Sequence, residues 1–286
     1  MNTRQNWNHV VFAAAVVVGA GLLVTSGRPF LTGLVVAVGS FSALWLLSLA
    51  VHDAGVADVF WGPGFVVLAA WYLVSADAPP GSRAWLVAAL VTIWAIRLAA
   101  HIWVRNRGKN EDFRYRQWRE ASGRSFWWVS FFKVFLLQAV TLWVVSSPLL
   151  LAHGGAVGLT LLDILGVTLF AVGFAIEVVA DRQLARFTAD PGNRGSILDS
   201  GLWGRSRHPN YFGEAVLWWG IGLFAVPTGG PLALLGPALL TFLLVRVSGV
   251  AMLDAALVER RPGYAEYIRT TPAFVPRLGR VSRNRS

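Results

Sequence analysis

The sequence contains no cysteine, which excludes a disulfide, a thiolate nucleophile and a cysteine-ligated metal site. Charged residues are also scarce, at 14% of the 286 residues, whereas hydrophobic residues make up 55%. The mean hydropathy is +0.55, which is too high for a soluble domain of this length. The composition therefore predicts an all-α, polytopic membrane protein.

Apolar stretches of spanning length recur along the chain. Because a bilayer core about 30 Å thick needs about 20 helical residues, they predict about eight transmembrane helices. They cover about residues 9–26, 30–51, 59–75, 84–103, 129–151, 158–180, 211–227 and 231–253. The first begins after a short polar stretch with one arginine, so we expect a retained helix, not a cleaved signal peptide. Gly-Pro-Gly at 62–64 is expected to break the third.

The net charge of +10 has a distribution that argues against a nucleic-acid partner. Most basic residues lie in three regions, 104–124, 182–207 and 259–286, whereas the connections near 151–157 and 227–231 have no lysine or arginine. Eight helices with both termini in the cytoplasm would place all three basic regions inside. This is the positive-inside pattern of membrane proteins.

The stretch GLWGRSRHPNYFGEAVLWWG (201–220) joins cationic residues directly to an apolar helix. Pro209 is suited to a first helical turn, and its N-terminal N–H groups attract anions. The nearby cationic side chains are Arg205, Arg207 and His208. Two readings stay open, an anion-binding helix start and a capped helix with arginines that extend to the interface.

Glu214 favours the first reading. It lies four residues after Asn210, so both side chains share one helix face. A carboxylate inside a span costs about 2.5–3.5 kcal/mol on insertion scales and by default marks a site. An anion site with a carboxylate one turn deeper suits a nucleotide, which has phosphates at one end and hydroxyl or amide donors at the other.

A second polar pair is Glu177 and Asp181, four residues apart near the cytoplasmic end of a predicted helix. Like charges at this spacing repel, so a ligand donor or a cation should face them. The cation of a purely structural pair would be Arg97, Arg182 or Arg246. Arg97 itself has three open readings: extending to the interface, binding a phosphate, or pairing with these carboxylates.

Asp58 lies beside the expected break at 62–64. Irregular backbone at membrane depth lines protein or a cavity, so Asp58 is a pocket candidate as well as a candidate interfacial cap. Gln138 is another polar residue within a span. No spacing of the histidines fits a metal site, so we expect no metal.

Three motifs together resemble a family. GLWGRSRHPNYFGEAVLWWG, ADRQLARFTADPGNRG (180–195) and RRPGYAEYIRTTPAFVP (260–276) look like a bacterial branch of the steroid 5α-reductase superfamily. WGPGFV (61–66) and NEDFRYRQWR (110–119) resemble it more weakly. The RHPNYFGE block is also typical of NADPH-dependent sterol reductases.

The resemblance implies a seven-helix core with one added N-terminal helix. We therefore expect N-terminal scaffold helices at 1–51, a catalytic membrane domain at 52–277 and a disordered basic tail at 278–286. The location implied is the bacterial inner membrane, with a site open to the cytoplasm. The implied activity is NADPH-dependent reduction of a C=C bond conjugated to a carbonyl, in a steroid- or lipid-like substrate taken from the bilayer.

The resemblance also implies site residues. Asn210, Glu214, Asp181 and Arg97 match family positions that contact the cofactor. The other residues expected at the cofactor are Glu177, Arg205, Arg207, His208, Tyr211 and Arg246. Asp58 and Trp94 fall where steroid reductases have a glutamate and a tyrosine that polarise the substrate carbonyl. We expect a protonated Asp58, assisted by the Trp94 N–H or by a nearby tyrosine, to donate to that oxygen.

Two other functions are possible. Membrane methyltransferases that use S-adenosylmethionine on isoprenylcysteine or phospholipid carry a shorter RHPxYxG version of the motif. Such enzymes are expected to have a carboxylate pair before the C-terminal tyrosine motif, where this chain has only Glu259. A transporter would show paired half-helices or inverted repeats, which the sequence lacks.

Overall fold

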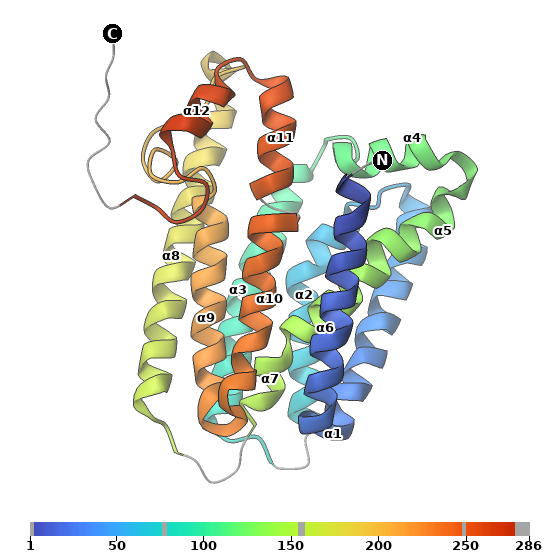
Figure 1. Ribbon diagram of the computed structural model, residues 1–286, viewed down its shortest axis with the longest axis vertical. Coiled ribbons are helices and arrows are strands. Elements are labelled where there is room, and N and C mark those ends of the chain that lie inside the picture. Colours follow the sequence, from blue (N-terminus) through green and yellow to red (C-terminus); the bar gives the residue numbers. More distant parts are fainter. Residues whose placement is uncertain (1–2, 76–78, 154–157, 248–249, 278–286) are drawn as a thin grey trace. The chain divides into compact units, whose positions relative to one another are not determined.

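The computed structural model describes residues 3–75, 79–153, 158–247 and 250–277. Every regular element in these ranges is helical (Figure 1), which confirms the predicted all-α class. The predicted tail at 278–286 lies outside the described residues. The chain forms two compact units, here called unit 1 (Met1–Asp163 with Ile221–Gly236) and unit 2 (Ile164–Gly220 with Pro237–Ser286).

Six segments of the described chain are long and apolar enough to cross a membrane, so the protein is a polytopic helical membrane protein. They are Gly27–Val51, Val56–Ser75, Ser82–Asn106, Phe113–Leu151, Leu161–Ala189 and Pro209–Val247. The predicted count of eight is not reproduced. The predicted span 9–26 is not among the six, and the predicted spans 211–227 and 231–253 share one 39-residue segment. The positions of the termini stay a prediction.

Unit 1 begins with α1 (Thr3–Val51), which is two helices joined at a kink. Gly27 has φ 66° and ψ −158°, a conformation that glycine adopts without steric cost. Pro29, two residues on, cannot donate to the preceding turn. The halves correspond to the predicted stretches 9–26 and 30–51 and run in opposite directions (Figure 1).

The expected break at 62–64 is wrong, because α2 (Val56–Ser75) passes through Pro63 as one helix. The glycines instead permit close packing. A Cβ added to Gly62 would lie 2.8 Å from the Ala95 carbonyl oxygen in α3 (Ser82–Asn106). A Cβ on Gly64 would lie 2.6 Å from Leu142 Cδ1. Helix α2 therefore packs so closely against α3 and against the helix that contains Leu142 that side chains larger than glycine would not fit at these two positions.

The rest of unit 1 follows the loop after α3. Its elements are α4 (Phe113–Ser122), η1 (Gly123–Ser125), α5 (Phe126–Ser130), the π-helical η2 (Phe131–Leu136), α6 (Leu137–Val145), α7 (Ser147–Leu151) and η4 (Gly230–Leu234). Large fully buried side chains in this unit include Phe30, Phe41, Phe65, Tyr72 and Trp94. Arg83 and Asp163 form a buried ion pair at 2.7 Å.

Unit 2 is built on two long helices and a C-terminal segment. Its elements are α8 (Leu161–Ala189), η3 (Pro191–Asn193), the first part of α9 (Pro209–Gly229), α10 (Leu235–Phe242), the π-helical η5 (Leu243–Val247), α11 (Val250–Arg260) and α12 (Tyr264–Thr270). The start of α9 at Pro209 confirms the predicted helix start. The short α12 lies in the C-terminal segment that follows α11.

Glycines hold α8 and α9 close together in unit 2. A Cβ on Gly213 would lie 2.6 Å from the Gly173 carbonyl oxygen, and one on Gly220 would lie 2.6 Å from the Gly166 carbonyl oxygen. From the first contact to the second, the residue number rises by seven in α9 and falls by seven in α8. The two helices are therefore antiparallel. At this separation Gly213 also reaches the backbone of Glu177, where its Cβ would be 2.7 Å from the amide nitrogen.

Candidate functional site

The α8–α9 packing brings two predicted cofactor residues into contact. Asn210 Nδ2, in the first turn of α9, donates to Asp181 Oδ1 near the end of α8 at 3.1 Å. Asp181 is only 4% exposed. The sequence assigned both residues to one site, and unit 2 places their side chains within one hydrogen bond.

Two more predicted carboxylates lie on the same two helices. Glu177 on α8 is 2% exposed, and Glu214 on α9 is 7% exposed. Glu177 is one turn before Asp181, and Glu214 is one turn after Asn210. Unit 2 therefore has three buried carboxylates and one half-buried amide on the facing helices α8 and α9, a set that is rich in hydrogen-bond acceptors.

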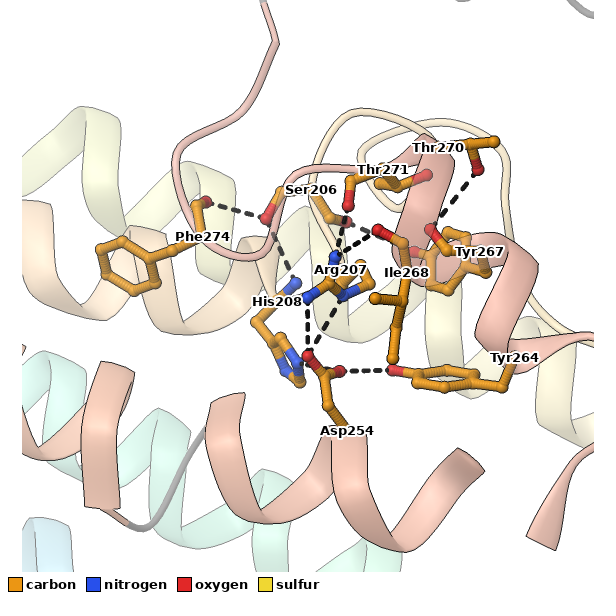
Figure 2. Close-up of polar contacts among 10 residues, drawn as sticks. All are labelled: Ser206, Arg207, His208, Asp254, Tyr264, Tyr267, Ile268, Thr270, Thr271 and Phe274. Atoms are coloured by element: carbon orange, nitrogen blue, oxygen red, sulfur yellow. Dashed lines mark hydrogen bonds and ion pairs between the residues drawn. The ribbon is translucent and has the colours of Figure 1, made fainter. Parts of the chain in front are cut away.

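The turn before α9 contains a second polar centre, here called the Asp254 cluster (Figure 2). Arg207 Nη2 lies 2.7 Å from Asp254 Oδ2 in α11, and Arg207 Nη1 donates to the carbonyl oxygens of Ile268 and Thr271 at 3.0 and 2.5 Å. His208 Nε2 lies 3.0 Å from Asp254 Oδ1, and Tyr264 donates to the same oxygen at 2.9 Å. The predicted phosphate ligands Arg207 and His208 are thus engaged inside the protein.

Backbone hydrogen bonds dock the C-terminal segment onto the same turn. The Arg207 N–H donates to the Pro272 carbonyl oxygen at 2.9 Å, and the Arg277 N–H donates to the Arg205 carbonyl oxygen at 3.0 Å. Ser206 Oγ donates to the Phe274 carbonyl oxygen at 2.8 Å. The segment 264–277 therefore holds the helix start in place from one side.

The Asp254 carboxylate is strongly biased toward its charged form. Burial alone would raise the pKa of this carboxyl group, but hydrogen bonds from His208 and Arg207 lower the pKa to about 2. Burial and the nearby Asp254 charge raise the pKa of the Tyr264 phenol, so it stays a hydroxyl donor. The cluster is an anchor in which the Asp254 carboxylate pairs with the Arg207 guanidinium.

The other predicted cofactor residues of unit 2 are more accessible. Arg205 and Arg246 have exposed side chains, in the turn before α9 and in η5. The Tyr211 ring stacks on the His208 ring, with centroids 5.6 Å apart and planes 2° apart. Their predicted contacts with a cofactor stay predictions.

Unit 1 contains a separate polar centre around Asp58 in the first turn of α2, here called the Asp58 cluster. Tyr115 Oη donates to Asp58 Oδ1 at 2.6 Å, and Arg114 Nη2 donates to Asp58 Oδ2 at 2.5 Å. Gln138 Nε2 lies 3.4 Å from Oδ1. Asp58 is thus an acceptor in an ion pair, whereas the sequence predicted a protonated donor. The ion pair with Arg114 is the reason for the difference.

A brace positions the start of α2 against α4. Glu111 accepts from the Ala54 N–H at 2.9 Å and pairs with Arg119 Nη2 at 2.7 Å. Burial would raise the pKa of Glu111, but the Arg119 and Ala54 hydrogen bonds lower it overall. Because Arg114 and Tyr115 are in the first turn of α4, the brace brings them to Asp58.

Trp94 and Arg97 lie one turn apart on α3 in unit 1. Trp94 is fully buried and contacts Phe65 edge to face, with ring centroids 5.7 Å apart. Arg97 is half-buried. The hydroxyl that donates to Asp58 belongs to Tyr115. A tyrosine near Asp58 was expected from the sequence, but its position in the chain was not predicted. Tyr115 lies in NEDFRYRQWR (110–119), the polar motif that resembles the family, and this position was the sign in the sequence that could have identified it.

A family model described as "Protein of unknown function (DUF1295)" matches residues 44–271. The uncharacterized protein C594.04c of Schizosaccharomyces pombe is 24% identical over 282 residues, which cover 88% of this chain and 80% of the yeast protein. No solved structure gives a significant match.

Proposed function

The chain belongs to the DUF1295 family of proteins of unknown function, a family in the steroid 5α-reductase-like group, and from this premise we propose that it is an NADPH-dependent membrane reductase. The proposed reaction reduces a C=C bond conjugated to a carbonyl in a steroid- or lipid-like substrate. The proposed location is the bacterial inner membrane, with the cofactor site open to the cytoplasm.

The contact between Asn210 and Asp181 carries the proposal. Two motifs, RHPNYFGE and ADRQLARF, carry the resemblance to NADPH-dependent reductases, and their polar side chains meet at 3.1 Å. The glycine packing of α8 against α9 makes this contact possible. A purely structural start of α9 would not need three buried carboxylates along the same pair of helices.

The residues present fit the chemical groups of NADPH. Ribose hydroxyls and the nicotinamide N–H group are donors, and the carboxylates of Glu177, Asp181 and Glu214 are acceptors for them. The phosphates need cations, and the exposed guanidinium groups of Arg205 and Arg246 can pair with them. Arg207 and His208 act instead through the Asp254 cluster, which fixes the turn that leads into Asn210.

The Asp58 cluster of unit 1, taken by itself, has donors of the kind that a conjugated carbonyl needs during reduction. When bound, NADPH would supply the hydride for the β-carbon of the enone, and negative charge would develop on the carbonyl oxygen before a solvent proton completes the product. Positioned N–H or O–H donors stabilise this developing charge. Arg114 is such a donor, because its guanidinium carries further N–H groups besides the one that donates to Asp58. Asp58, which also accepts from the Tyr115 hydroxyl, holds this guanidinium in place. Asp58 is therefore a positioning residue in this mechanism.

Isotopic labelling tests the reaction. Purified protein is incubated with a long-chain enone and NADPH carrying deuterium at the transferable position of the nicotinamide. The expected product is the saturated ketone with one deuterium at the β-carbon. Absence of labelled product with steroid, isoprenoid and straight-chain enones, together with methyl transfer from S-adenosylmethionine, would refute the reductase.

A further inference from the structure

Gln138 in α6 uses one end of its side-chain amide and leaves the other end without a partner. Nε2 faces Asp58 Oδ1 at 3.4 Å, whereas Oε1 is buried and has no hydrogen bond within the part of the chain that the structure describes. Rotating the amide by 180° would place Oε1 against the carboxylate oxygen. The Asp58 contact therefore fixes Oε1 as an acceptor that lacks a donor.

Thr141 places a second polar atom on the same helix. It lies three residues after Gln138 in α6, so the two side chains are neighbours on one face. Thr141 is 5% exposed, and its Oγ1 is likewise without a partner among the described residues. Buried polar atoms are nearly always hydrogen-bonded in native proteins, so this pair points to a bound polar group.

The donors nearest to Gln138 are already engaged. Arg114 Nη2 and Tyr115 Oη both donate to Asp58, as does Gln138 Nε2. Gln138 Oε1 therefore needs a donor from a bound ligand. The Thr141 hydroxyl can in turn donate to the ligand atom that carries this proton. A ketone oxygen has no proton to donate, whereas an O–H group satisfies both atoms at once.

We propose that Gln138 Oε1 and Thr141 Oγ1 bind a hydroxyl group of the substrate. The hydroxyl donates to Gln138 and accepts from Thr141. The side chains of Asp58 and Arg114 are 19% and 22% exposed, so the Asp58 cluster next to this pair is open to a ligand. The substrate class is then a lipid enone that also carries a hydroxyl. The enone rests on the proposed function, whereas the recognition of the O–H group needs no cofactor.

A matched pair of ligands tests the proposal. The probes are a γ-hydroxy enone with a dodecyl chain and its O-methyl ether, which keeps the oxygen but loses the donor. Binding to detergent-solubilised protein without nucleotide is measured by calorimetry. We expect the hydroxy form to bind the wild-type protein about tenfold or more tightly than the ether, because loss of the donor leaves Oε1 unpaired.

Three variants assign the preference to this pair. Gln138→Leu and Thr141→Val should reduce the preference to less than about threefold, mainly by weakening binding of the hydroxy form. Thr141→Ser keeps the hydroxyl and should retain the preference. Thermal unfolding of each variant shows that it is folded.

The outcomes separate this inference from the proposed function. Equal binding of both probes to the wild-type protein means that water supplies the O–H group, which overturns the inference. Turnover of both enones at equal rates would also overturn it while leaving the reductase intact. A strong preference for the hydroxy form without any oxidation of NADPH would support this site and refute the reductase.

Discussion

Arg207 in the turn before α9 and Asp254 in α11 form a buried ion pair, with Nη2 and Oδ2 2.7 Å apart and side chains 9% and 13% exposed. Two further bonds of Arg207 reach carbonyl oxygens of the C-terminal segment (Figure 2). The arginine of the RHPNYFGE motif thus joins the helix start, α11 and the C-terminal segment 264–277. This segment is therefore part of the proposed cofactor site, because it fixes the turn that presents Asn210.

Replacing Asp254 by Asn should produce a pH-dependent loss of stability. The pKa of Asp254 in the folded protein is about 2, below its ordinary value, so folding favours the ionised form. This contribution, on the order of 2 kcal/mol, is complete above about pH 4 and is lost as the pH falls toward 2. Thermal unfolding of both proteins in non-ionic detergent should show a gap at pH 6 that is about half as large at pH 3 and continues to close toward pH 2. A gap of constant size over this range would contradict the account.

Replacing Arg207 by Lys should release the C-terminal segment. A lysine carries the charge but cannot pair with Asp254 and reach the carbonyl oxygens of Ile268 and Thr271 at the same time. We expect trypsin to cleave after Arg269 at least about tenfold faster in Arg207→Lys than in the wild-type protein. Arg205→Lys is the matched control, because the Arg205 side chain is exposed and the bond from Arg277 uses only its backbone. Equal cleavage of the two variants would refute the anchor.

Replacing Gly213 by Ala should destabilise the protein and weaken NADPH binding together. The added Cβ would lie 2.6 Å from the Gly173 carbonyl oxygen, so α8 and α9 would have to separate. Overpacking of this kind costs typically 1–3 kcal/mol. Gly39→Ala is the control, because a Cβ there meets nothing within 4 Å, and alanine favours a helix by about 0.5–1 kcal/mol. Thermal unfolding that ranks the two variants the other way would show that the packing argument is wrong.

Replacing Tyr115 by Phe should separate catalysis from cofactor binding. It removes the hydroxyl that donates to Asp58 at 2.6 Å and leaves the ring in place. Because this hydroxyl helps to hold the carboxylate that orients the Arg114 donor, its loss should lower kcat by up to about 100-fold, the cost of a misplaced catalytic group, whereas the affinity for NADPH should not change. Trp94→Phe tests the original assignment in parallel and should lower kcat far less. A larger loss in Trp94→Phe than in Tyr115→Phe would restore Trp94 as the donor.

The apolar spans and the start of α9 could be predicted from the sequence, because each depends only on residues that are close together in the chain. The start of α9 at Pro209 follows from one residue and its neighbours. The path through 62–64 could not be predicted in the same way. Whether Gly-Pro-Gly breaks a helix depends on what packs against it, and the Ala95 backbone of α3 lies where only a glycine fits.

The partners of charged residues depended on contacts that are distant in sequence. Arg207 was expected to meet a phosphate, but its carboxylate partner lies 47 residues later in the same protein. Asp58 was expected to donate a proton to a ligand, but it accepts a hydrogen bond from Tyr115, which lies 57 residues later in the chain. The sign of a charge predicts the sign of its partner and does not tell whether that partner is a ligand or a side chain.

Nucleotide titration tests the central claim most directly. Detergent-purified protein is titrated with NADPH, NADH and S-adenosylmethionine, and binding is followed by calorimetry in the wild-type protein and in Asn210→Ala. We predict that NADPH binds with a Kd in the micromolar range, that Asn210→Ala weakens it at least about tenfold by removing the contact with Asp181, and that S-adenosylmethionine does not bind. Binding of S-adenosylmethionine without binding of NADPH would contradict the account.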